Sequence, residues 1–317
     1  MKIAIIVNPI SGRGTGKKSI PEIRQYMEKE GAEFRIFETE KPWHAAELAE
    51  KAAQNGYDVV AAAGGDGTAN EVLNGLMRIS SGRKQRPAFA VLCVGRGNDF
   101  AYGVNAPSAL SEACALIANG HREPLDVGFV KGGLFPQGRY FGNGVGIGFD
   151  AVVGFEALKL APLSGFFCYI VAALKTIFLY DKAPMVEIQM DGETLRQPAL
   201  MVSVMNGRRM GGGFMMAPEA LSHDGFLDIC IAGDVKKGGI LPLIGRFIKG
   251  NQSTHPLIIT RRVQKITVRA IGGTLPAHSD GETLCTEGSL LEIEIRPDQI
   301  DIISVKSHHP GKHATDS

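Results

Sequence analysis

The chain has 317 residues, which is more than one ordinary hydrophobic core holds, so we expect two domains. Its net charge of +1 gives no reason to expect a nucleic acid or another polyanion as partner. Five scattered cysteines without a CxxC pair, and a strand pattern that starts directly after Met1, predict reduced thiols and a cytoplasmic protein without a signal peptide.

The first 124 residues alternate short apolar runs with helical segments. The expected strands are residues 3–7, 34–37, 59–63 and 88–94. The expected helices are residues 19–30, 43–55, 70–77 and 108–119, the first opening with a capping-box pattern from Ser19 to Glu22. This alternation predicts an α/β fold, with a doubly wound parallel sheet in an N-terminal domain at 1–124.

Three polar loops with glycines, at residues 8–17, 64–68 and 95–100, each follow one of these strands. The carboxyl ends of parallel strands form the ligand crevice, so the three loops can converge there. The first loop is not a Walker A motif, because Gly12 and Gly16 are one residue too close and Lys18 stands where Ser or Thr is required. A phosphate-cradling loop of another type stays open.

The second loop, Gly64-Gly65-Asp66-Gly67-Thr68, has the clearest chemistry. Its glycines allow close approach to a ligand, and the helix that follows offers N–H groups and a positive dipole end to phosphate. Asp66 is an acid in a corner that suits anions, which favours Mg²⁺ as its partner, since Mg²⁺ prefers carboxylate and phosphate oxygens. A tight turn in which Asp66 caps the helix is the alternative.

The pattern changes after Leu125. The expected strands are residues 126–130, 140–148, 186–190, 199–205, 226–232, 264–270 and 290–295, and the expected helices are residues 152–180 and 238–249. This predicts a mostly antiparallel β-sandwich domain at 125–297. A further strand at 300–305 could return to the first domain, so that 298–308 belongs to it, and 309–317 is a polar, flexible tail.

The longest apolar stretch, residues 163–180, is interrupted by Lys175 and is only marginally long enough to span a membrane. Core packing and a membrane-docking face both explain it. Basic pairs could add attraction to anionic head groups, although such pairs are usually solvated surface; they are Arg208-Arg209, Lys236-Lys237 and Arg261-Arg262.

One pentapeptide occurs twice, as residues 191–195 and again as residues 280–284, each reading Asp-Gly-Glu-Thr-Leu. Asp-Gly is the standard signal for a two-residue hairpin turn, so both copies are consistent with plain turns.

In chain order, the motifs resemble the catalytic-domain family of diacylglycerol kinases, and its bacterial soluble lipid kinases in particular. The resemblance spans nearly the whole chain and is carried by Asn8-Pro9 with Ser11-Gly12, the 64–68 loop with Asn70-Glu71, residues 97–101, Asn143-Gly144, Asn206-Gly207, residues 211–213, residues 224–228 and residues 280–282. The 64–68 loop alone is less specific, because NAD kinases and phosphofructokinases have similar loops.

The resemblance implies ATP and Mg²⁺ as cofactors. It assigns ATP binding to Asn8, Ser11, Gly12, Thr39, Gly64, Gly65, Asp66, Gly67, Thr68, Asn70, Glu71, Asn98 and Asp99. Arg96 stands where the family usually has a Thr that contacts nucleotide. Arg96 could bind phosphate, block the pocket or point to solvent.

The resemblance also implies a base and a structural metal. In the second pentapeptide Glu282 would take the proton of a lipid hydroxyl, with Asp280 orienting it or touching Mg²⁺ and Asp66 as a further catalytic carboxylate. A structural Mg²⁺ would be held by the Asp224 carboxylate and the carbonyls of Leu221 and Phe226, unless Asp224-Gly225 is a simple turn into a strand.

The sequence therefore favours an ATP-dependent lipid kinase, with diacylglycerol as the preferred acceptor and phosphatidic acid as product. A soluble kinase similar to NAD kinases, and a non-catalytic nucleotide-binding protein disabled by Arg96, are the alternatives. We further expect peripheral association with a membrane that supplies the lipid, no nucleic-acid partner, and a possible homodimer through an exposed edge strand.

Overall fold

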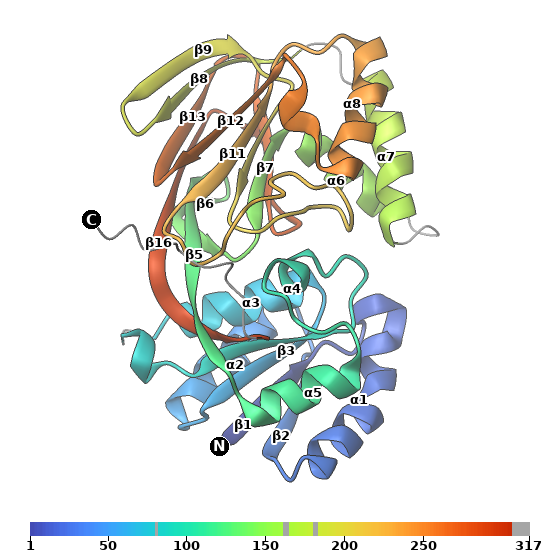
Figure 1. Cartoon of the computed structure of the whole chain (residues 1–317), viewed down its shortest axis with the longest axis vertical. Helices are drawn as coiled ribbons and strands as arrows, with labels where there is room; N and C mark the ends of the chain where they lie inside the picture. The colour runs from blue at the N-terminus through green and yellow to red at the C-terminus, as the bar shows by residue number, and fades with distance from the viewer. Residues whose placement is uncertain (80–81, 161–164, 180–182, 306–317) are drawn as a thin grey trace, which may run out of the picture.

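The computed structural model describes residues 1–79, 82–160, 165–179 and 183–305 (Figure 1). The expected tail at 309–317 lies outside the described residues, as do residues 161–164 and 180 of the helix expected at 152–180. The described chain forms two halves, a parallel α/β half and an antiparallel sandwich half, which confirms the predicted fold class.

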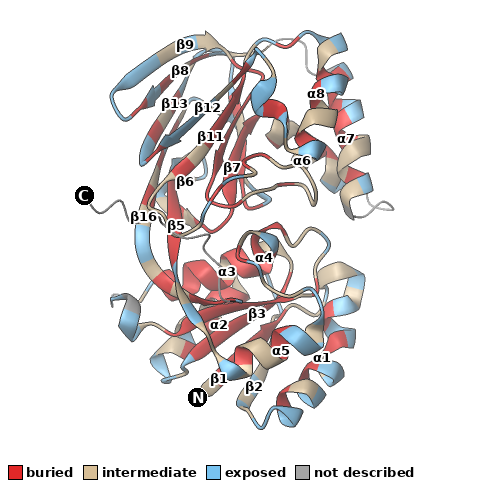
Figure 2. Ribbon diagram, viewed as in Figure 1, coloured by how far each residue is buried: buried red, intermediate tan, exposed pale blue. Residues whose placement is uncertain are grey.

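The N-terminal half is built on four parallel strands. In spatial order they are β2 (Glu33–Glu38), β1 (Lys2–Val7), β3 (Val59–Gly64) and β4 (Ala88–Cys93). The helices α1 (Ser11–Lys29) and α5 (Leu110–Asn119) pack on one face of this sheet, and α2 (His44–Gln54) and α3 (Asp66–Met77) pack on the other. The short α4 (Asp99–Gly103) and η1 (Arg83–Gln85) flank β4. Because helices cover both faces, every residue of β3 is buried (Figure 2).

The C-terminal half packs two sheets face to face. One has six strands, in the order β12 (Ile258–Val263), β11 (Leu227–Ala232), β10 (Met201–Met205), β7 (Gly144–Gly148), β14 (Leu275–Ser279) and β15 (Glu282–Gly288). The other extends the large sheet with β16 (Leu290–Ile303), β13 (Lys265–Gly272), β8 (Met185–Met190), β9 (Glu193–Pro198), β5 (Arg122–Gly132) and β6 (Phe135–Phe141).

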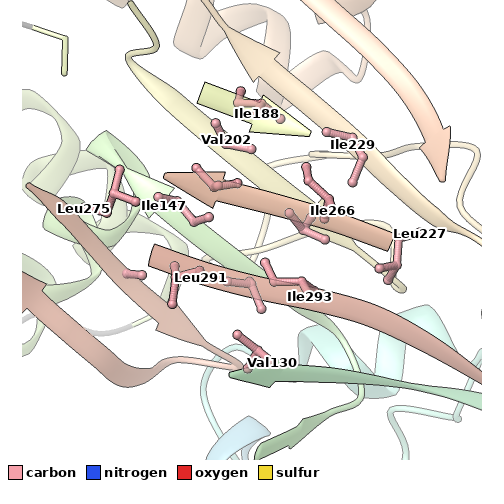
Figure 3. Close-up of a cluster of buried hydrophobic side chains, with 14 of the residues drawn as sticks. Val130, Ile147, Ile188, Val202, Leu227, Ile229, Ile266, Leu275, Leu291 and Ile293 are labelled. Atoms are coloured by element: carbon pink, nitrogen blue, oxygen red, sulfur yellow. The ribbon is translucent and has the colours of Figure 1, made fainter. Parts of the chain in front are cut away.

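The core of the sandwich is aliphatic. Ile188 and Leu291 of the large sheet face Ile147 and Val202 of the six-stranded sheet in one buried cluster (Figure 3). The outer face of the six-stranded sheet is covered by α6 (Phe149–Lys159), α7 (Gly165–Leu179) and α8 (Lys237–Lys249), and η2 (Gln252–Thr254) follows α8.

Two long strands, β5 and β16, join the halves. The start of β16 pairs with β13 in the sandwich, and its end lies parallel to β4, with Ile302 opposite Phe89. The strands expected separately at 290–295 and 300–305 are thus one strand, whose pairing with β5 is irregular between Arg296 and Ile300. This irregularity bends the strand from one half into the other.

Several local predictions were wrong in their boundaries. The helix expected at 152–180 is two helices, since α6 ends at Lys159 and α7 begins at Gly165. The strand expected at 140–148 is broken between β6 and β7, because the backbone there is bonded to Asp280. The helix expected from Ser19 begins earlier: α1 extends from Ser11 with a kink at residues 12–14, whose backbone is not helical, and the Ser19 hydroxyl donates to the Gly16 carbonyl. Likewise, α3 begins at Asp66 rather than Asn70, directly after Gly65.

Candidate active site

A cavity of about 500 Å³ lies between the two halves and reaches into the sandwich half. Twelve of the residues predicted to bind nucleotide or act in catalysis contribute to its wall: Asn8, Ser11, Gly12, Gly65, Asp66, Gly67, Thr68, Glu71, Arg96, Asp99, Asp280 and Glu282. Four predicted residues do not line it, namely Thr39, Gly64, Asn70 and Asn98.

The N-terminus of α3 forms one wall of the cavity. Gly65 precedes the helix in an extended conformation, and the side-chain amide of Asn8 donates to the Thr68 hydroxyl (3.1 Å), which links the first loop to the second. The first turn of a helix has N–H groups without intrahelical acceptors, and these attract anions. The wall is therefore suited to phosphate.

Two acids lie at this helix start: Asp66, which is half-buried in the first turn of α3, and Asp99, which is buried. Burial raises the pKa of Asp66, the Phe100 N–H that donates to Oδ1 (2.9 Å) lowers it, and the charge of Asp280 raises it further. Burial and then the charge of Asp66 raise the pKa of Asp99 to about 7, although the Gly212 N–H and Arg209 bind its carboxylate. The two acids thus share a site in which a cation would be favoured.

The second pentapeptide forms the hairpin turn between β14 and β15. Asp280 is 7% exposed and accepts four hydrogen bonds, from the N–H groups of Gly142, Asn143 and Gly144 and from the Asn70 side chain. These bonds fix the turn, so that Glu282 lies over the start of α3: a Cβ on Gly67 would come within 3.1 Å of its Oε1. Asp280 therefore holds the turn in place, and Glu282 faces the cavity.

Asn70 belongs to a network that connects the halves. Its amide nitrogen donates to Asp280 (2.7 Å), and its amide oxygen accepts from the Arg139 guanidinium (2.6 Å). Asn74, one turn further along α3, exchanges hydrogen bonds with the backbone of Tyr140. Asn70 therefore holds Asp280 and Arg139 in place and does not line the cavity.

The sequence does not single out Arg139, which is buried and lies against the rings of Trp43 and Phe135. A single arginine in a segment of ordinary composition carries no local signal. Glu71 lines the cavity nearby, and the Ala45 N–H donates to its carboxylate (3.2 Å). Burial raises the pKa of Glu71, and the charge of Glu282 raises it as well, while Arg139 lowers it.

The remaining predicted nucleotide residues shape the loops. The N–H of Thr39, which follows β2, donates to the carbonyl of Val7, the last residue of β1. The backbone of Asn98 is left-handed, and its side chain donates to the Gly95 carbonyl. Gly64 ends β3, where a Cβ would overlap the Thr68 side chain. Arg96 is exposed on the cavity wall.

The residues expected to hold a structural Mg²⁺ lie away from the cavity. The guanidinium of Arg262 pairs with Oδ2 of Asp224, and the Phe226 N–H donates to Oδ1 (3.1 Å). Both carboxylate oxygens of Asp224 are therefore engaged, and Arg262 already supplies the positive charge. The residues as arranged do not fit a bound metal ion, so magnesium at this position stays a prediction without support from the geometry.

The deeper part of the cavity is apolar. Its wall comes from α6, α7, α8 and the segments between β10 and β11, and includes Phe149, Val153, Tyr169, Ala173, Met201, Met210, Phe214, Met216, Ile244 and Phe247. A phosphate-suited region and an apolar chamber are thus parts of one cavity.

This arrangement defines a two-domain α/β protein with a helix start that is suited to phosphate and faces acidic groups from a β-sandwich. Residues 2–130 match the diacylglycerol kinase catalytic domain, and residues 143–304 match the YegS C-terminal NAD kinase beta sandwich-like domain. The chain is 30% identical over 289 residues to a diacylglycerol kinase of Staphylococcus aureus, covering 86% of this chain and 87% of that protein. The diacylglycerol kinase of Staphylococcus saprophyticus is also 30% identical, over 88% of both chains. The chain belongs to the diacylglycerol kinase family.

Solved structures agree with this assignment. A crystal structure of a diacylglycerol kinase from Bacillus anthracis matches with a TM-score of 0.72 at 25% identity, covering 96% of this chain and 97% of that one. A second crystal structure from the same organism gives a TM-score of 0.77 at 27% identity over the same shares. The yeast NADH kinase, at 11% identity and a TM-score of 0.50, shares the fold alone.

Proposed function

We propose that this protein is an ATP-dependent lipid kinase that transfers the γ-phosphate to a lipid hydroxyl, with diacylglycerol as acceptor and phosphatidic acid as product. The observation that carries the proposal is the single cavity, which joins the phosphate-suited start of α3 to an apolar chamber. A water-soluble acceptor would have no use for that chamber, whereas lipid tails bury apolar surface there.

ATP would place its phosphates at the start of α3, against the backbone of Gly65, Gly67 and Thr68. Asn8 and Ser11 come from the first loop on the same side of the cavity, and exposed Arg96 is placed to contact a phosphate oxygen. These groups hold the nucleotide through backbone and hydroxyl donors, without a Walker A lysine.

Mg²⁺ fits the site at Asp66. The Phe100 N–H binds Oδ1 of this carboxylate, while Oδ2 lies beside Gly97, where a Cβ would come within 2.9 Å of it. In the described ranges no group of three or more Asp, Glu, His or Cys side chains could hold an ion, which agrees with a cation that takes its other ligands from phosphate and water. When bound, Mg²⁺ neutralises charge on the phosphates.

Glu282 would act as the base. The acceptor hydroxyl oxygen bonds to the γ-phosphorus, its proton passes to the Glu282 carboxylate, and the bond from the γ-phosphorus to the bridging oxygen breaks to release ADP. Asp280 keeps the hairpin in place for this step through its four hydrogen bonds. Positioning of the acceptor and neutralisation of charge would supply most of the catalysis.

The apolar chamber opens among helices that also carry exposed apolar side chains. Phe167 and Phe178 of α7 are 63% and 80% exposed, and Leu241 and Ile248 of α8 are exposed as well. No helix within the described residues is long and apolar enough to cross a membrane. We propose that this surface contacts the membrane that supplies the lipid.

Several members of the basic pairs have other partners. Arg209 pairs with Asp99, Arg261 with Glu193 and Arg262 with Asp224. Attraction of these pairs to anionic head groups stays a prediction. The cytoplasmic location and a homodimer through an edge strand stay predictions.

The test is a phosphorylation assay with ATP and Mg²⁺ in mixed micelles. The acceptors are diacylglycerol, ceramide, sphingosine, phosphatidylglycerol and undecaprenol, with NAD as a soluble control. We expect labelled phosphatidic acid from diacylglycerol, and its loss in Asp66→Asn. Labelled NAD without labelled lipid would replace the proposal by a soluble kinase, and nucleotide binding without any product would replace it by a non-catalytic role.

A further inference from the structure

A polar cluster lies in the apolar surroundings beneath α6. Gly146 of β7 has Ser203 of β10 and His278 of β14 as its cross-strand neighbours, so the three share the outer face of the six-stranded sheet. Asp150, in the first turn of α6, approaches the same place, with Oδ2 3.9 Å from Nε2 of His278. Neighbouring residues of this face are apolar, among them Met201, Met205 and Cys230.

Three polar atoms of this cluster are buried without a hydrogen-bond partner among the residues that the structure describes: Asp150 Oδ2, Ser203 Oγ and His278 Nδ1. Ser203 is fully buried and His278 is 8% exposed. Buried polar atoms in folded proteins nearly always have a partner, because leaving one without costs about 1–3 kcal/mol. These atoms belong to three neighbouring side chains, and the Nε2 of the same imidazole faces Asp150, which indicates a site that is completed by a ligand or by water.

The cluster belongs to the wall of the same cavity as the candidate base. Asp150 and His278 both line the cavity, as does Glu282. Glu282 pairs with Ser279 across the β14–β15 hairpin, and Ser279 is the residue after His278 in β14. The gap between Asp150 and His278 is too long for a direct hydrogen bond and is suited to an oxygen atom that bonds both. Gly146 makes the arrangement possible, since a Cβ there would overlap both side chains.

We propose that Asp150 and His278 form a subsite for a second oxygen of the acceptor lipid, next to the hydroxyl that is phosphorylated. The proposal rests on the proposed function and deepens it. The oxygen is an ester carbonyl, which accepts from the imidazole, or a second hydroxyl, which can bond both side chains. Asp150 acts as a positioning residue for the imidazole, and the subsite favours lipids with such an oxygen over lipids with a lone hydroxyl.

The experiment compares three acceptors in mixed micelles. 1,2-Dioctanoylglycerol has ester carbonyls, 1,2-dioctylglycerol has the same hydroxyl and tails without carbonyls, and 1-octylglycerol has a second hydroxyl. We expect kcat/KM to be at least tenfold higher for one of the two oxygen-bearing acceptors than for 1,2-dioctylglycerol, mainly through KM. The acceptor with the higher kcat/KM shows whether the subsite binds an ester carbonyl or a second hydroxyl.

In His278→Phe and Asp150→Asn this preference, taken as the ratio of kcat/KM between acceptors within each variant, falls to within about twofold. Thermal unfolding of each variant, compared with the wild type, shows that it folds. His121→Phe, at a partly exposed histidine away from the cavity, keeps the preference. Equal rates of the wild type with all three acceptors, or a preference that survives in His278→Phe, would overturn the subsite. No phosphorylated lipid at all would overturn the proposed function and the subsite with it.

Discussion

The two copies of Asp-Gly-Glu-Thr-Leu fold in the same way at two different places in the molecule. Each forms a two-residue turn with both central residues at positive φ, 35° and 97° at Asp191 and Gly192, and 49° and 83° at Asp280 and Gly281. Each turn joins two antiparallel strands in matching register. The local sequence thus determines the turn in both places.

Their surroundings differ. Asp191 is exposed and accepts two backbone hydrogen bonds at the start of β13, and Glu193 pairs with Arg261 in solvent. Asp280 is buried between the halves of the molecule, and Glu282 faces the start of α3. What makes the second copy a candidate catalytic hairpin is therefore its tertiary position, and the first copy is a natural control for it.

The largest expected difference between the two copies is in kcat, when the glutamate of each copy is replaced by glutamine. Glu282→Gln removes the base, and we expect kcat to fall by about 100-fold or more. Glu193→Gln, in the same pentapeptide, leaves kcat unchanged, because Glu193 contacts only exposed Arg261. Lipid phosphorylation at saturating ATP measures both, and a full rate in Glu282→Gln would remove the base assignment while leaving the kinase.

The two aspartates should differ in stability. Asp280→Asn replaces an acceptor of four hydrogen bonds by a side chain with one oxygen and a donor, which leaves buried N–H groups unpaired and costs about 3 kcal/mol. Asp191→Asn disturbs two hydrogen bonds in solvent and costs about 1 kcal/mol or less. Urea unfolding of both variants checks this, and equal costs would mean that Asp280 does not join the halves.

Much of the fold was predictable because its signals are local. Apolar runs such as β3, the glycine loop at its end and the Asp-Gly turns each depend on residues close together in the sequence. The break between β6 and β7 was not predictable, since it depends on Asp280, more than 130 residues further on. The continuity of β16 through an irregular register is likewise a tertiary effect.

The site was predictable to a similar degree. Motif positions identified the residues of the cavity wall, but a motif does not tell which way a side chain points. Asn70 was expected to meet the nucleotide, and it points toward Asp280 and Arg139 instead. Arg139 and the Asp150–His278 pair have no motif at all, and only the packing of the two halves brings them to the site.

Buried Asp99, which lines the same cavity as the second hairpin, predicts a pH dependence of stability. The pKa of Asp99 is about 7 when folded and about 4 in an unfolded chain, so between these pH values the folded state binds the additional proton. Stability therefore falls as the pH rises through this window. Asp99→Asn abolishes this contribution.

The thermal midpoint of Asp99→Asn relative to the wild type should accordingly be higher at pH 8 than at pH 5, by roughly 3 °C or more. Thermal unfolding in the two buffers measures the difference. A difference that is constant with pH, or that decreases, would show that Asp99 is ionised throughout this range.

The smallest difference in stability between the two copies is expected when the glycine of each turn is replaced by alanine. No atom outside the turn lies within 4 Å of a Cβ placed on Gly192 or Gly281, so an alanine at either position meets only the cost of its positive φ. That cost is about 1 kcal/mol in both Gly192→Ala and Gly281→Ala. Equal shifts in urea unfolding would place the whole difference between the two copies in the tertiary contacts of Asp280 and Glu282. A much larger loss in Gly281→Ala would show that the docked hairpin needs a turn geometry that its exposed copy does not.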